Sequence, residues 1–186
     1  MKKIIVNEII STICNIWNKN ISQDYNLGIL LEEDTLKCAF YYHLRRKLGK
    51  LMVENHLCIF TEYLGTEFKK MNYRPDMVIV KMKDNCDEEY LINHVEEVIV
   101  AIEFKLKSRY EYNSIIADRE KIKNYVKCID NHCQYVLAVI HEKYWENPYW
   151  FDNRQANNWA KGRVTELVAN YDNEKCENML FQAQRY

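Results

Sequence analysis

The chain has 186 residues, of which 48% are hydrophobic and 28% charged, and its formal net charge is −1. The length and apolar content predict one domain over residues 1–186 with a core of its own, and the 4 Gly and 2 Pro exclude a collagen-like or disordered chain. The near-zero charge excludes a global basic field, so a nucleic-acid partner would have to bind a local patch of cations.

The seven cysteines are scattered and odd in number, which predicts reduced thiols in a cytoplasmic protein rather than a disulfide framework. The sequence CIDNHC at 128–133 has a spacing that fits no common zinc site. The five histidines form no metal-binding motif, and the four glycines stand alone. This pattern argues against a P-loop or a dinucleotide-binding loop.

The N-terminal segment begins with two lysines and an apolar run, as a secretory signal does, but Asn7, Glu8 and Asn15 interrupt the run. Isoleucines recur instead at helical spacing, at positions 5, 9, 13 and 16. We therefore expect an amphipathic helix over 1–20 that packs on the domain, followed by a connection over 18–28. No run approaches the roughly 18 apolar residues of a membrane span, so no membrane partner is expected.

The following segments alternate between helical and strand-like patterns. Helical spacing predicts helices over 30–50 and 113–129, and branched or continuously apolar runs predict strands over 57–64, 73–82, 98–107 and 134–140. Residues 83–97 read as a long hairpin loop, 143–153 as an aromatic loop and 157–171 as a helix. The order predicts an α/β sandwich of three layers around a central mixed β-sheet, with the N-terminal helix and a C-terminal extension (142–186) packed on it.

The predicted strand at 98–107 has one unusual face. Side chains two apart in a strand point the same way, so one face, from Val100 to Leu106, is apolar throughout. The other face begins with Ile99 and Ala101 and then carries Glu103 and Lys105. A solvated face would be polar from end to end, so this strand is expected to leave a core carrying a carboxylate and an amine.

Asp76 precedes the apolar run of the neighbouring strand, so a hairpin between the two strands would bring it to Glu103 and Lys105. Two carboxylates suit Mg²⁺, which binds oxygen ligands and keeps positions for water and phosphate. The lysine can stabilise charge on a reacting phosphate. The alternative is a salt bridge between Glu103 and Lys105 at a solvated strand end, with Asp76 capping a turn.

The sequences RPD at 74–76 and EFK at 103–105 resemble the motif of the PD-(D/E)XK nuclease superfamily, the restriction-endonuclease-like fold. The resemblance covers about residues 30–141 and implies an αβββαβ core. It implies Asp76, Glu103 and the carbonyl of Phe104 as ligands of Mg²⁺, with Mn²⁺ as a substitute. It also implies Lys105 as the catalytic lysine.

Members of this superfamily commonly add an acidic residue from the first core helix and a polar residue from the second. The resemblance favours Glu33 for the first role, with Glu32 and Glu62 as rivals. For the second role it favours Lys121 over Asp118, which lies one helical turn earlier.

Two further groups of residues could bind nucleic acid. The aromatic residues between 144 and 159 could stack on unpaired bases or could instead cover an edge of the sheet, and we favour the second interpretation. Scattered cations could line a phosphate-binding groove, although solvated surface is the simpler explanation for each one. These are Arg45, Arg46, Lys69, Lys70, Arg74, Lys107 and Arg109.

The resemblance implies a Mg²⁺-dependent nuclease that hydrolyses phosphodiester bonds, acts on DNA in preference to RNA, and works as a monomer or homodimer. One alternative is a catalytically silent nuclease-like domain kept as a nucleic-acid-binding or scaffolding module. Another is a general α/β domain with a different ligand.

Overall fold

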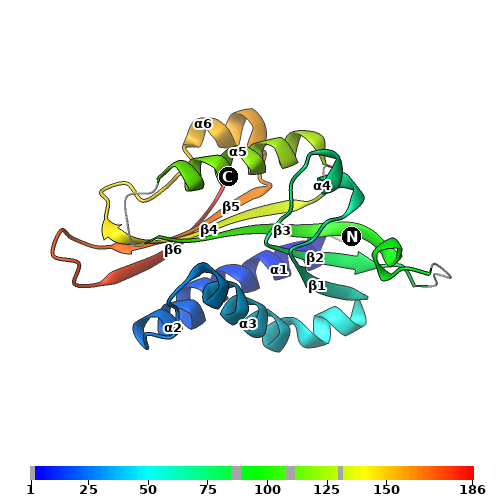
Figure 1. Cartoon of the computed structure of the whole chain (residues 1–186), viewed down its shortest axis with the longest axis horizontal. Helices are drawn as coiled ribbons and strands as arrows, with labels where there is room; N and C mark the ends of the chain where they lie inside the picture. The colour runs from blue at the N-terminus through cyan, green and yellow to red at the C-terminus, as the bar shows by residue number, and fades with distance from the viewer. Residues whose placement is uncertain (1–2, 85–88, 108–111, 130–131) are drawn as a thin grey trace.

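A six-stranded mixed sheet crosses the computed structural model, which describes residues 3–84, 89–107, 112–129 and 132–186 (Figure 1). Neighbouring strands follow chain order: β1 pairs with β2 and β2 with β3 antiparallel, β3 with β4 and β4 with β5 parallel, and β5 with β6 antiparallel. The predicted hairpin and mixed sheet are thereby confirmed. The strands are β1 (Leu57–Thr61), β2 (Met77–Met82), β3 (Val95–Lys107), β4 (Gln134–Tyr144), β5 (Val164–Tyr171) and β6 (Met179–Arg185).

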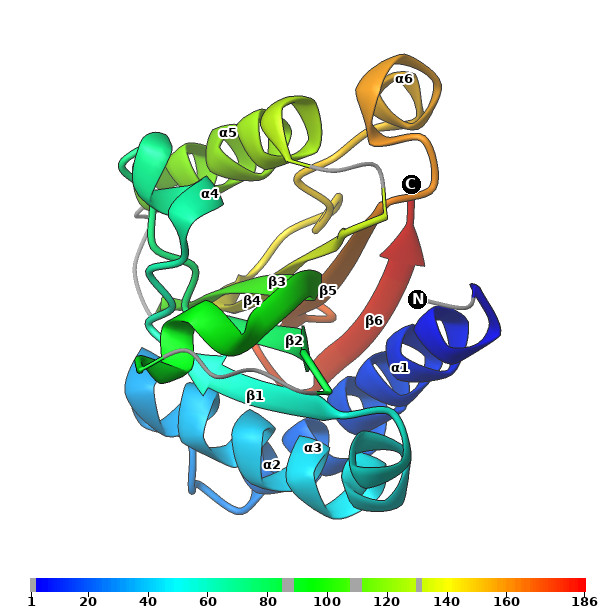
Figure 2. The same cartoon turned by 90° about the vertical axis from the view of Figure 1, so that its right-hand side faces the viewer.

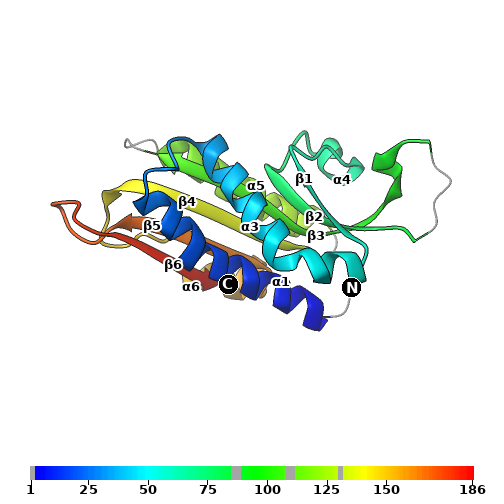
Figure 3. The ribbon, with the colours of Figure 1, turned by 90° about the horizontal axis from the view of Figure 1, so that it is seen from below.

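One face of the sheet is covered by the N-terminal helices, with α1 (Lys3–Asn15) and α3 (Glu33–Glu54) lying across it (Figure 3). Between them, the π-helix η1 (Ile16–Ile21) and α2 (Ser22–Asn26) continue the helical path. The connection expected over 18–28 is therefore wrong for most of its length. The physical reason is burial, because a helical path carries Trp17 and Ile21, both fully buried, into the core.

The opposite face is covered by α5 (Tyr112–Cys128), with α4 (Thr66–Lys70), α6 (Asn153–Gln155) and the π-helix η3 (Ala156–Ala160) beside it (Figure 2). A short 3₁₀ helix, η2 (Leu91–His94), leads into β3. Two hydrophobic clusters fill the spaces on either side of the sheet, so the expected three layers are present. None of the described helices is both long and apolar enough to cross a membrane.

Strand β3 divides its side chains between the two cores largely as the alternation predicts. Val100, Ile102 and Phe104 pack toward α1 and α3, and Ala101 packs toward α5. Ile99 departs from the prediction because a β-bulge between the pairs Ile79–Val100 and Val80–Val98 moves it to the first face. After the bulge the alternation is regular, so Glu103 faces α5.

The C-terminal extension differs from the prediction. The helix expected over 157–171 is wrong, because Val164–Tyr171 forms β5, and β6 then adds an unpredicted edge strand. Residues 164–170 are all buried between β4 and β6, and their polar members Thr165, Glu166 and Asn170 fall on both faces, so the segment lacks the alternation of polar and apolar residues from which a strand is recognised. Backbone pairing on both sides overrides the helix propensity of its Glu, Leu and Ala residues.

The aromatic segment after β4 packs over the sheet and is held by Glu166. This fully buried carboxyl accepts the Trp150 N–H at 2.6 Å and the Tyr186 hydroxyl at 3.1 Å. Trp145 and Trp150 contact each other at 5.5 Å between ring centres, and Phe151 is 3% exposed. Trp145 and Trp150 thus cover the sheet, as the favoured interpretation expects, but they lie beside the inner strands β4 and β5 rather than at an edge. Burial raises the pKa of Glu166 to about 7, although the hydrogen bonds oppose this change.

Replacing Trp17→Ala should lower the free energy of unfolding by about 3–5 kcal/mol, because it opens a cavity and removes the hydrogen bond from Nε1 to the Val168 carbonyl. Urea denaturation measures this change. The control is Val53→Ala on α3, where the side chain is 80% exposed and a change within about 0.5 kcal/mol is expected. Equal losses in both variants would contradict an anchoring role for Trp17.

Glu166 should make stability fall with rising pH. Its pKa is about 7 in the folded chain against 4.5 for an ordinary glutamate, so the folded state binds more protons within that range. The contribution is complete below pH 4.5 and is lost as the pH rises through 7. Urea unfolding measured between pH 4.5 and 7 gives the free energy of unfolding at each pH. This free energy should fall less steeply with pH in Glu166→Gln than in the exposed control Glu174→Gln. Identical slopes would contradict the assignment.

Candidate active site

The candidate site lies where β3 extends past its neighbour β2. Met77, the first residue of β2, pairs with Ile102, so beyond this point β3 has no partner strand on that side. The side chain of Asp76 takes the place of a strand there, because its Oδ2 accepts the N–H of Phe104 at 2.8 Å. This hydrogen bond holds Asp76 beside the sequence Glu103–Lys105, as the hairpin predicts.

Glu103 is 1% exposed and is surrounded by groups that hold its carboxyl in place. The Tyr125 hydroxyl donates to its Oε1 at 2.7 Å, and Nζ of Lys121 lies 3.5 Å from its Oε2. Burial raises the pKa of Glu103 to about 8, the carboxylate of Asp76 adds to this effect, and Lys121 opposes it. The alternative of a solvated salt bridge with Lys105 is wrong for this buried side chain.

Lys105 lies between carboxylates from two helices on opposite faces of the sheet. Its Nζ is 3.1 Å from Oε1 of Glu33 and 2.9 Å from Oδ2 of Asp118, and it donates to the Phe104 carbonyl at 2.9 Å. Burial opposes the charge of this ammonium, but Asp118 and Glu33 outweigh it and raise its pKa above the ordinary value. The site therefore holds a charged lysine in a fixed position.

Asp118 and Lys121 both reach the site from α5. Asp118 is 2% exposed and lies 2.6 Å from Nζ of Lys121 as well as next to Lys105. The pKa of Lys121 is raised, because Glu103 and Asp118 outweigh the effect of its burial. The sequence favoured Lys121 over Asp118, whereas in the structure Asp118 joins the two lysines.

The three acidic rivals occupy different places. Glu33 contacts Lys105, as expected for a residue of the site. Glu32 instead caps α3, forming a capping box with Thr35 at the surface. Glu62 lies outside the central group and pairs with Arg74 at 2.9 Å and with Lys37.

Sequence reasoning missed Lys37 and Tyr125. Nζ of Lys37 lies 3.5 Å from Oδ1 of Asp76 and also contacts Glu62. Its pKa is raised, since these carboxylates outweigh the effect of burial. Lys37 follows Glu33 by four residues on α3, and Tyr125 follows Lys121 by four on α5, so helical spacing could have placed both beside the site.

Three of the basic residues proposed to line a phosphate-binding groove have different surroundings in the structure. Arg74 lies next to the site through Glu62, Arg46 lies over the ring of Tyr42 on α3, and Lys69 lines a separate cavity. Arg109 lies outside the described residues.

Asp118→Asn should lower the free energy of unfolding by about 3 kcal/mol, because it leaves two largely buried lysines with one carboxylate fewer. The matched control is Glu120→Gln on the exposed side of α5, which pairs with Arg119 and Lys123 and should cost at most about 1 kcal/mol. Urea denaturation compares the two variants. Equal costs would show that Asp118 does not organise the site.

The arrangement combines two adjacent carboxylates, a backbone carbonyl and a fixed ammonium, which together can bind a hard cation and stabilise negative charge on a phosphate. Comparison with known proteins finds no match to a family model, a curated protein or a solved structure. The chemistry of these side chains is therefore the guide to function.

Proposed function

We propose that this protein is a Mg²⁺-dependent nuclease that hydrolyses phosphodiester bonds, with DNA as the preferred substrate. The hydrogen bond from the Phe104 N–H to Asp76 carries the proposal, because it brings the Asp, Glu and Lys of the motif to one place. The chain order α3, β1, β2, β3, α5, β4, interrupted by the short helices α4 and η2, provides further support, since the resemblance implies an αβββαβ order.

The residues present fit a hard divalent cation. Asp76, Glu103 and the Phe104 carbonyl offer oxygen ligands, and Mg²⁺ commonly uses one or two carboxylates while keeping several waters. The described residues contain no group of three or more His, Cys, Asp or Glu side chains suited to a metal, so a site made wholly of protein ligands is not proposed. When bound, the cation would polarise a phosphoryl oxygen and lower the pKa of a coordinated water.

The lysine would act on the substrate. Lys105 keeps its charge because Glu33 and Asp118 flank it, and a fixed ammonium stabilises the charge that develops on phosphorus oxygens during in-line attack. Lys121 and Tyr125 would orient Glu103, since both contact its carboxyl oxygens. Glu33 would position Lys105.

One observation favours the silent binding module as a second candidate. Lys37 lies 3.5 Å from Asp76 and Lys121 lies 3.5 Å from Glu103, so each proposed ligand carboxylate already has a cation beside it. Such internal neutralisation would let the site persist without a metal. The nuclease would cut nucleic acid only in the presence of a divalent ion, whereas the silent module would bind nucleic acid without cutting it and without a divalent ion.

Cleavage of supercoiled plasmid and of single-stranded DNA in Mg²⁺, Mn²⁺ or EDTA tests the proposal. The wild type should cleave only with a metal, and Lys105→Ala should lower the rate by about 10²-fold or more.

Asp76→Asn keeps the acceptor for the Phe104 N–H but removes the charge, so it should abolish Mn²⁺ binding measured by calorimetry. Lys50→Ala, at an exposed lysine of α3 that pairs with Glu54, is the control and should retain activity.

Cleavage that persists in EDTA, or that is unchanged in Lys105→Ala, would reject this mechanism. DNA binding by an inert wild type without dependence on metal would select the silent module.

A further inference from the structure

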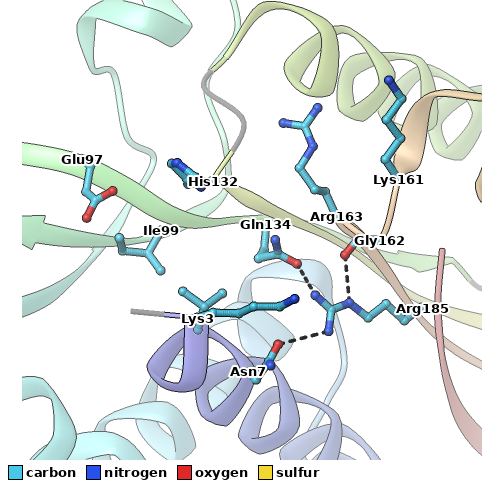
Figure 4. Close-up of a pocket in the computed structure, with 11 residues that line it drawn as sticks. Lys3, Asn7, Glu97, Ile99, His132, Gln134, Lys161, Gly162, Arg163 and Arg185 are labelled. Atoms are coloured by element: carbon cyan, nitrogen blue, oxygen red, sulfur yellow. Dashed lines mark hydrogen bonds between the residues drawn. The ribbon is translucent and has the colours of Figure 1, made fainter. Parts of the chain in front are cut away.

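A basic groove lies at the start of the parallel strands. It consists of two adjoining cavities, each of about 560 Å³, that share Lys161 and Arg163 (Figure 4 shows the first). We use the name basic groove for the surface formed by Lys3, Lys127, Trp159, Lys161, Arg163 and Arg185. These residues come from α1, α5, η3, the turn before β5 and the end of β6, so only the folded chain brings them together.

The basic groove is separate from the candidate active site. Glu97 and Ile99, near the start of β3, line its first cavity, whereas Glu103 and Lys105 lie near the other end of the strand. Six residues of strand between Glu97 and Glu103 correspond to about 20 Å. The two surfaces therefore lie at opposite ends of β3.

Arg185 is held rigidly without a carboxylate partner among its contacts. Its Nε donates to the Gly162 carbonyl at 2.9 Å, one terminal nitrogen donates to Gln134 at 2.9 Å, and the other donates to Asn7 at 3.3 Å (Figure 4). All three acceptors are neutral, so none of them offsets the positive charge of the guanidinium. Since these bonds use three of its five N–H groups, two remain for a ligand in a fixed orientation.

The lysines add exposed charge along the same surface. Lys3, Lys127 and Lys161 are exposed, and none of them forms an ion pair within the part of the chain that the structure describes. Lys161 and Gly162 both have positive φ, of 51° and 75°, in the turn that presents Lys161 beside the groove. Among the described residues that line the two cavities, Glu97 is the one acidic side chain.

This concentration of cations contrasts with the net charge of −1 for the whole chain. A row of cations spread over two cavities suits a chain of phosphates better than a single anion. The half-buried Trp159 lines the second cavity together with Asn158 and offers an aromatic ring for a base.

We propose that the basic groove binds the sugar–phosphate backbone of a single-stranded nucleic acid, at a distance from the candidate active site where cleavage would occur. The choice of a nucleic acid as the polyanion rests on the proposed nuclease function. The cationic character of the groove is independent of that proposal. The groove would hold a strand through its phosphates and so add affinity without sequence preference.

Fluorescence anisotropy of a short labelled oligothymidylate, measured in EDTA at several salt concentrations, tests this proposal. The variant combining Lys3→Ala, Lys127→Ala and Lys161→Ala should bind about tenfold or more weakly than wild type, with the salt slope reduced by about 0.7 for each phosphate that the variant no longer neutralises. The matched control combines Lys19→Ala, Lys47→Ala and Lys175→Ala, which removes the same charge from exposed positions elsewhere and should bind as the wild type does. Circular dichroism confirms that both variants are folded.

Equal binding by the two triple variants would overturn the proposal. It would also be overturned if thymidine monophosphate displaced the oligonucleotide at concentrations near the dissociation constant of the oligonucleotide, because the groove would then hold a single nucleotide. Asp76→Asn should bind like the wild type in this assay. Failure of wild-type cleavage would reject the nuclease proposal and leave this binding result standing, so the two proposals fail separately.

Discussion

A central strand that extends past the end of its neighbour has backbone N–H groups with no partner in the sheet. A buried N–H without a hydrogen bond raises the free energy of the folded state. In this protein β3 continues beyond the first residue of β2, and the Asp76 side chain accepts the N–H of Phe104. One hydrogen bond thus completes the sheet edge and also positions a carboxylate beside Glu103 and Lys105. The candidate site depends on this contact, because Asp76 lies 27 positions before Glu103 in the sequence and is brought to it only by the fold.

The site also concentrates buried charge, which is stable only as a network. Asp118 pairs with Lys105 and Lys121, and Lys121 in turn approaches Glu103. Removing water from each ion costs free energy that its partners must offset, so the loss of one member leaves another uncompensated. The same arrangement raises the pKa of Lys105, which keeps its charge, and raises the pKa of the buried Glu103 carboxyl to about 8. The contacts that stabilise this part of the fold are therefore the same contacts that fix the side chains of the candidate site.

Much of the fold could be predicted from local pattern. Helical spacing located α3 and α5, and apolar runs located the first four strands, because each pattern repeats with the period of its element. The C-terminal third could not be predicted in this way. Residues 164–170 of β5 are buried, with polar residues on both faces, so the segment lacks strand periodicity, and its place depends on β4 and β6. Likewise, residues 16–26 become helical because their apolar side chains meet the sheet, which a local reading of polar residues misses.

For the candidate site, the local pattern was enough to single out three charged residues: the carboxylate before β2 follows from the start of an apolar run, and the charged pair on β3 follows from alternation along the strand. The partners of these residues depend on how the helices pack against the sheet. Lys37, Tyr125 and Asp118 come from two helices on opposite sides of the sheet, and the basic groove joins α1 to the end of β6. The physical reason is that periodicity records the direction of a side chain relative to its own element. The distance between elements depends on how they pack, and no single segment encodes it.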